Sequence, residues 1–133
     1  MPERATLERA KRDLREGKRP STAAGEFVRE EIEHVRHGKH GARSTRQAIA
    51  IGLSKARRAG VPLPPPREGR TSERTRRSAE RAYEVGQGKR KARAPSRARS
   101  KAVSRALRRE GRGAASRAAL STQAKRAGAA RNR

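Results

Sequence analysis

The chain contains no cysteine and no tryptophan, and Phe27 and Tyr83 are its only large aromatic residues. The absence of cysteine excludes disulfide bonds, thiolate metal sites and cysteine nucleophiles together. The shortage of aromatic side chains argues against proteins that bind single strands by stacking bases on aromatic platforms. Contact between arginine and a nucleic-acid groove or backbone fits this composition better.

Large apolar residues are also scarce. Leu, Ile, Val and Phe number 15 among 133 residues, and nine of them lie between positions 27 and 63. One small packed unit is the most that such a chain supports. No apolar run is long enough to span a bilayer, and the chain opens on a charged helical pattern without the apolar region of a signal peptide. We therefore expect a cytoplasmic protein that does not bind membranes.

Positive charge, by contrast, is abundant and rises toward the C-terminus. Residues 1–42 carry 10 Lys and Arg against 8 Asp and Glu, residues 43–88 carry 11 against 4, and residues 89–133 carry 16 against 1. The last third, whose one acid is Glu110, cannot neutralise itself and must attract anions from outside the chain. A polyphosphate backbone is the commonest cellular anion of this kind.

Apolar residues spaced by three or four, with Gly or Pro between the runs, predict five or six helices and no strand. Residues 2–16 have a thin apolar face and predict a marginal helix. A second helix, capped by Ser21 or Thr22, reaches about His37, and a capping box at residues 44–47 opens a third helix that ends near Gly60. The second and third helices are expected to fold back on each other as an αα-hairpin.

Beyond the hairpin, closely spaced prolines at positions 62–66 require an extended linker. Thr71 or Ser72 then opens a helix that reaches about Val85. The final segment repeats a Ser-basic-Ala pattern with a period of four, from Ser96 onward. Like charges four residues apart oppose a helix, so we expect this arm to be partly disordered until it meets a polyanion.

The predicted fold is therefore all-α, a small helical hairpin core with a basic, partly disordered helical C-terminal extension. Its expected segments are a marginal N-terminal helix at 1–19, the hairpin core at 20–61, a Pro-rich linker at 62–70, a basic helix at 71–88 and an Arg/Ala/Ser-rich nucleic-acid-binding arm at 89–133.

A basic stripe is predicted on the final segment, formed by Arg97, Lys101, Arg105 and either Arg108 or Arg109. On a helix these charges recur about every 6 Å, close to the spacing of phosphates along one strand of a duplex. Arg outnumbers Lys by 29 to 8, and its planar fork suits phosphates. The candidate nucleic-acid-binding residues are Arg74, Arg77, Arg81, Lys89, Arg90, Lys91, Arg93, Arg97, Lys101, Arg105, Arg108, Arg109, Arg112 and Arg117.

Three histidines, His34, His37 and His40, lie three residues apart near Glu30 and Glu33 and suggest a metal site. His40, however, follows the glycine that ends the helix, and no Cys or Asp completes a ligand set. We favour a solvated polar face and predict no metal and no other cofactor. The serines lack plausible His and acid partners, and no Gly-rich loop could hold phosphate, so no enzymatic activity is expected.

Four acids, Glu26, Glu30, Glu31 and Glu33, form the one surface predicted to bind the basic arm, either within the chain or in a second copy. This leaves self-association open, although a solvated face is the simpler interpretation of the four acids.

The segment from Arg46 to Gly60, RQAIAIGLSKARRAG, resembles a helix found in a family of small, basic, uncharacterised bacterial proteins. The preceding residues 26–41 resemble the same family, so that the likeness covers about residues 20–62. It implies a bacterial origin and a short helical module. The family has no established activity that could be carried over to this chain.

Taken together, the sequence predicts a non-enzymatic, largely sequence-independent DNA-binding protein of the nucleoid-associated kind. Its Arg and Lys side chains would contact the phosphate backbone of duplex DNA. One alternative is a basic protein that binds structured RNA or the ribosome. Another is a protein-interaction module with a basic tail, which would keep its binding activity after deletion of residues 89–133.

Overall fold

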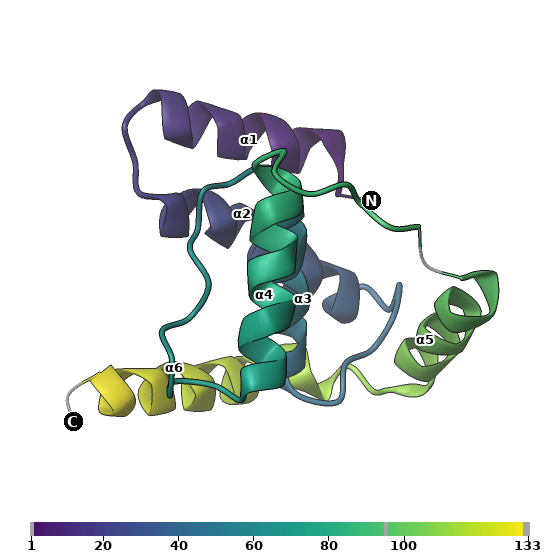
Figure 1. Cartoon of the computed structure of the whole chain (residues 1–133). Helices are drawn as coiled ribbons and strands as arrows, with labels where there is room; N and C mark the ends of the chain where they lie inside the picture. The colour runs from purple at the N-terminus through teal and green to yellow at the C-terminus, as the bar shows by residue number, and fades with distance from the viewer. Residues whose placement is uncertain (1, 95, 132–133) are drawn as a thin grey trace. The chain divides into compact units, whose positions relative to one another are not determined.

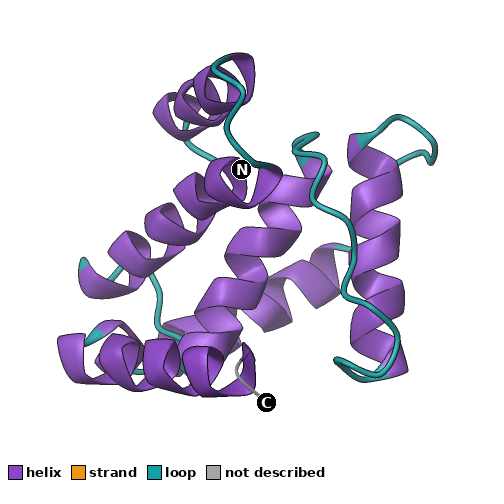
Figure 2. Ribbon diagram, turned by 90° about the vertical axis from the view of Figure 1, so that its left-hand side faces the viewer, coloured by secondary structure: helices purple, strands orange, loops and turns teal. Residues whose placement is uncertain are grey.

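The computed structural model describes residues 2–94 and 96–131, which are all-α and contain no strand (Figure 2). The all-α prediction is confirmed for these residues. The helices, labelled in Figure 1, are α1 (Arg4–Arg15), α2 (Pro20–Arg36), α3 (Thr45–Arg58), α4 (Glu73–Gly86), α5 (Arg97–Arg109) and α6 (Arg117–Arg131), with a short 3₁₀ helix, η1 (Gly113–Ala115), before α6.

Local signals set most helix ends. The Ser72 hydroxyl accepts a hydrogen bond from the Thr75 amide at the start of α4, and Ser96 caps α5 through the Arg99 amide in the same way. Ser44 accepts from the amide of Gln47, while the Gln47 side chain accepts from the amide of Arg43, one residue earlier than in a standard capping box. Helix α2 begins earlier than predicted because proline suits a first helical turn.

The described chain forms two compact units whose segments alternate along the sequence. The first unit combines the residues up to Glu30 with Ile51–Arg93, and the second combines Glu31–Ala50 with the residues from Ala94 onward. The boundary therefore passes through α2 and α3, whereas the predicted segments followed one another in chain order.

In the first unit, the core forms around Phe27, which is completely buried among small residues. The other buried members of this cluster are Ala10, Ala23, Ala24, Ala56 and Val61, and Leu7, Leu14, Leu53 and Leu63 pack against it. Helix α1 is thus part of the core despite its thin apolar face. Two polar contacts to α2 help to hold it, a 3.0 Å ion pair from Arg9 to Glu26 and a 3.1 Å hydrogen bond from Thr6 to Glu30.

The two hairpin helices approach closely where Gly52 of α3 faces Val28 of α2. A Cβ atom on Gly52 would lie 2.6 Å from the Cα of Val28, so only a hydrogen fits between the two backbones. Close contact of this kind maximises dispersion attraction where large apolar side chains are few. The predicted packing of α2 against α3 has its physical basis at this glycine.

The Pro-rich segment lies within the first unit and does not separate one unit from the other. The Arg57 guanidinium of α3 donates hydrogen bonds to the carbonyl oxygens of Leu63, at 3.1 Å, and Pro64, at 3.0 Å. Desolvation lowers the pKa of Arg57 from its ordinary value. Gly86 of α4 lies so close to the Arg57 carbonyl that a Cβ would clash with it. Arg57 thus ties the extended segment to α3, beside the C-terminal end of α4.

In the second unit, the loop after α2 forms backbone hydrogen bonds with the last turn of α5 and with the segment that follows it. The Gly41 amide donates to the Leu107 carbonyl at 2.7 Å, and the Ala42 amide donates to the Gly111 carbonyl at 3.2 Å. Thr45 and Arg36 donate to the carbonyls of η1. The expectation of partial disorder in the C-terminal arm finds no support in residues 96–131, which form α5, η1 and α6.

Replacing Gly52 by alanine should destabilise the protein by about 1–3 kcal/mol, because the added methyl group overpacks the α2–α3 contact. Gly25, on the exposed side of α2, is the matched control, since its Cβ would meet nothing within 4 Å. Gly25→Ala should stabilise the protein by about 0.5–1 kcal/mol through helix propensity. Urea unfolding followed by circular dichroism measures both changes, and equal signs would refute the proposed contact.

Candidate nucleic-acid interface

Helix α5 carries five of the predicted binding residues. Arg97, Lys101 and Arg105 are successive members of one row, about 6 Å apart and turned by about 40° at each step. Arg108 falls inside the arc that these three cover, and Arg109 falls outside it. We call Arg97, Lys101, Arg105 and Arg108 the α5 stripe. All four side chains are exposed, and none forms an ion pair with an acid of the described residues.

Helix α5 is held mainly near its C-terminal end. None of its residues is buried, and Val103 is a large apolar side chain that remains 54% exposed. The helix is anchored through its backbone, since the Leu107 carbonyl accepts from Gly41 and the Glu110 carbonyl lies directly against the Gly41 Cα. This arrangement leaves the side chains of the stripe exposed to solvent.

Arg108 also lines an open pocket of about 430 Å³. The pocket combines basic groups, one acid and the loop after α2, and its lining consists of Gly38, Lys39, His40, Gly41, Arg108, Glu110 and Arg112. Arg112 donates to the Arg36 carbonyl at 3.3 Å, which fixes the guanidinium without neutralising its charge. The structure therefore brings two predicted residues, Arg108 and Arg112, together with Lys39, which the sequence analysis did not select.

The predicted cations of α4, Arg74, Arg77 and Arg81, belong to the first unit. Their spacing of three and four residues places them on one exposed face. The neighbouring Arg76 is different because it forms two hydrogen bonds with Glu73, at 3.1 and 3.0 Å. These bonds lower the pKa of Glu73 and raise that of Arg76 from their ordinary values. The α4 face therefore presents three cations beside a neutralised pair.

The remaining predicted residues lie outside the helix interiors. Lys89, Arg90, Lys91 and Arg93 follow α4 and are exposed. Arg90 donates to Glu84 at 2.8 Å, so its charge is partly neutralised. Arg117 is exposed at the first position of α6.

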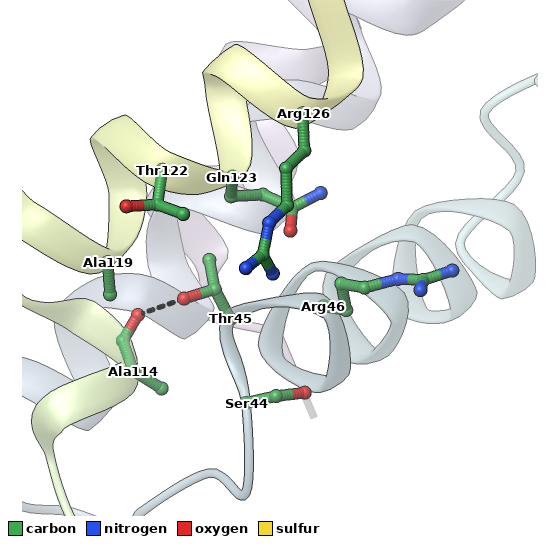
Figure 3. Close-up of a pocket in the computed structure, with 8 residues that line it drawn as sticks. All are labelled: Ser44, Thr45, Arg46, Ala114, Ala119, Thr122, Gln123 and Arg126. Carbon is green, nitrogen blue, oxygen red and sulfur yellow. Dashed lines mark hydrogen bonds between the residues drawn. The ribbon is translucent and has the colours of Figure 1, made fainter. Parts of the chain in front are cut away.

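Two further cations, which the sequence analysis did not select, lie in an open pocket of about 300 Å³ in the second unit. Figure 3 shows the Arg126 side chain reaching from α6 toward Thr45, with Arg46 extending from the first turn of α3. The Thr45 hydroxyl donates to the Ala114 carbonyl at 2.6 Å and joins α3 to η1. In the sequence, Arg46 lies within the capping pattern at residues 44–47, which predicts only a helix start, so that the one available signal for this cation is its charge.

The acidic residues predicted as one surface are in fact engaged separately. Glu26 pairs with Arg9, Glu30 accepts from the Glu3 amide at 2.6 Å and is buried, and Glu31 is completely buried. Glu33 is the one exposed member of the four. These acids do not offer the basic arm a continuous open surface.

The histidines are divided by the structure. His37 is exposed, as expected for a solvated face. His34 and His40 instead lie beside the buried carboxylate of Glu31, at 3.8 Å and 3.2 Å respectively, with their rings edge to face. One ligand atom from each of these three residues lies within 4.8 Å of the others, which is close enough to hold a metal ion. From the sequence, Glu31 is predicted only as part of the acidic surface.

Residues 17–67 match the profile of a family of unknown function, DUF6496. This match supports the predicted resemblance to an uncharacterised family and includes α2, α3 and the Pro-rich segment. No curated protein and no solved structure matches the chain. Among the described residues, no helix has both the length and the apolar character needed to cross a membrane.

Gly41 provides a test of how α5 is anchored. A Cβ at Gly41 would clash with the Glu110 backbone, so Gly41→Ala should break the contact between the loop and the end of α5. We expect a loss of about 1–3 kcal/mol in the free energy of unfolding and faster hydrogen exchange at the Gly41 and Ala42 amides. Gly111→Ala is the control because open space surrounds that position. Unchanged exchange in Gly41→Ala would contradict this anchoring.

Proposed function

We propose that this protein binds duplex DNA without catalysis and largely independently of sequence, in the manner of nucleoid-associated proteins. The observation that carries the proposal is the α5 stripe, four exposed cations without an acidic partner among the described residues. Their repulsion is relieved most directly by phosphates, whose bound counterions are released when the protein binds.

The geometry of the stripe suits a phosphate backbone. A helix places Arg97, Lys101 and Arg105 about 6 Å apart, and the steady turn of the row lets it follow a winding strand. Arginine forms bidentate hydrogen bonds with phosphate and also enters narrow minor grooves. In the first unit, the exposed cations of α4, Arg74, Arg77 and Arg81, offer a separate set of phosphate contacts.

Sequence-independent binding is supported by the composition of the basic segments. Residues 89–133 contain no aromatic side chain for stacking on bases and no zinc-finger ligand set. Phosphate contacts position a protein on DNA but carry no base information. In a bacterial cell, such a protein would be found with the nucleoid.

Binding should also order the arm further. In an isolated helix, each pair of like charges four residues apart would destabilise α5 by about 0.2–0.5 kcal/mol. No buried side chain compensates for this repulsion. Phosphates would remove the repulsion, so we infer that the helicity and protection of α5 increase when DNA binds.

Neutralising the stripe should weaken binding in a way that reports the number of phosphate contacts. The triple variant Arg97→Gln, Lys101→Gln and Arg105→Gln should bind a mixed-sequence duplex more weakly. The slope of log K against log salt should fall by about 2.7, since each lost contact contributes about 0.9. Fluorescence anisotropy at several salt concentrations measures this slope.

A matched control removes the same charge from α1, with Lys11→Gln, Arg12→Gln and Arg15→Gln, all exposed positions. Its slope should stay near that of the natural chain, which we expect to lose about 10³- to 10⁵-fold in affinity between 50 and 200 mM salt. A flat salt response of the natural chain, or equal losses in both triple variants, would refute the proposal.

Folded RNA is the second candidate, because an arginine-rich, aromatic-poor arm also suits the phosphates of structured RNA. A competition binding experiment distinguishes a preference for duplex DNA from a preference for folded RNA. We expect unlabelled duplex DNA to displace labelled duplex at a lower phosphate concentration than a folded RNA of equal length. The reverse order would assign the protein to RNA.

A further inference from the structure

We propose that Glu31, His34 and His40 bind a divalent metal ion of the zinc type. This inference is independent of nucleic-acid binding and rests on the packing of three side chains within the second unit. Glu31 is completely buried, and the side chains of His34 and His40 are only 14% and 18% exposed. The site is therefore enclosed by the protein but remains accessible to an ion.

The local backbone explains how three ligands separated along the chain meet. Glu31 and His34 are three residues apart on α2, so they point from the same face of its last turns. Gly38 then adopts a φ of 75°, a left-handed conformation that ends the helix and reverses the chain. His40 consequently returns to the same face, with its ring against that of His34.

The contacts of His40 place one ring nitrogen against a backbone carbonyl and the other against a carboxylate. Nδ1 lies 2.9 Å from the Gly41 carbonyl oxygen, which can only accept, so Nδ1 carries a proton. Nε2 lies 3.2 Å from the carboxylate oxygen Oε2 of Glu31, which also accepts. Two lone pairs would face each other unless a proton or a metal ion lies between them. A histidine that donates one N–H to a backbone carbonyl and presents the other nitrogen is the usual arrangement of a metal ligand.

The distances fit a zinc ion. Tetrahedral coordination with bonds of about 2.0–2.1 Å separates ligand atoms by about 3.4 Å. The separations here are 3.2 Å from Oε2 of Glu31 to Nε2 of His40 and 3.8 Å from Oε1 of Glu31 to Nδ1 of His34, so each histidine faces its own oxygen of the carboxylate. One ligand atom from each of the three residues lies within 4.8 Å of the others, and rotation of the carboxylate would bring them onto a single ion. Two imidazoles with one carboxylate favour zinc-like ions over Mg²⁺, which prefers oxygen ligands. Three protein ligands leave one position for water or another ligand.

Zn²⁺ alone, titrated into the full chain with a chromophoric chelator as competitor, tests the site. We expect one tightly bound ion per chain, and no comparable response to Mg²⁺. Glu31→Gln, His34→Gln and His40→Gln should each weaken binding by about 100-fold or more, since even outer-sphere partners of a metal cost 10- to 100-fold. His37→Gln is the matched control because it removes an exposed histidine from the same region, and it should bind as the natural chain does.

A measurement on the natural chain keeps the test decisive if a variant fails to fold. Nitrogen NMR of the histidine rings should show Zn²⁺ shifting Nε2 of His40 and Nδ1 of His34, while both His37 nitrogens stay unchanged. Equal weakening by His37→Gln and His40→Gln, or zinc-induced shifts at His37 alone, would mean adventitious surface binding and would overturn the proposal. No zinc binding would also overturn it.

Discussion

Backbone approaches backbone at Gly41, Gly52 and Gly86, where a Cβ atom would meet the chain of a neighbouring segment. A chain with so few large apolar side chains cannot build a thick core, so its segments pack at the shortest range that glycine and alanine allow. Phe27, the largest completely buried side chain of the described residues, lies in a cluster whose other buried members are four alanines and Val61. Most charged side chains of the helices consequently stay exposed to water.

The distribution of charge follows from the same packing. In the first unit, acids are used to join elements, as in the ion pair between Arg9 and Glu26 and the hydrogen bond from Arg90 to Glu84. In the second unit, Glu31 is buried and the exposed side chains of α5 are almost all basic or small. Folding therefore neutralises part of the N-terminal charge and leaves the α5 stripe uncompensated. The proposed affinity for polyphosphate arises from this remainder and needs no enclosed binding pocket.

The elements of the fold could be predicted because their signals are local. Serine caps, glycine stops and apolar spacing predict α3 and α4 close to their observed bounds, whereas the end of α5 at Arg109 was not predicted. Pairing between distant segments could not be predicted, because it depends on individual contacts such as that of Gly41 with Glu110. Such contacts produce no periodic pattern in the sequence. Nor does the sequence around Arg57 indicate that its guanidinium binds carbonyls six and seven residues ahead. Glu31 was grouped with neighbouring acids, because burial alone distinguishes it from Glu33.

The loop after α2 connects the two proposed sites. His40 belongs to the histidine and glutamate cluster, and the next two residues donate hydrogen bonds to the segment at the end of α5. A metal ion on His40 would restrict this loop and therefore the anchor of the basic helix. Thermodynamic linkage is reciprocal. If metal binding favours the anchored position of α5, then DNA that binds α5 in this position must increase the affinity for the metal by the same factor. The strength of this coupling depends on how much the loop moves without metal, because an ion that meets an already rigid loop shifts no equilibrium.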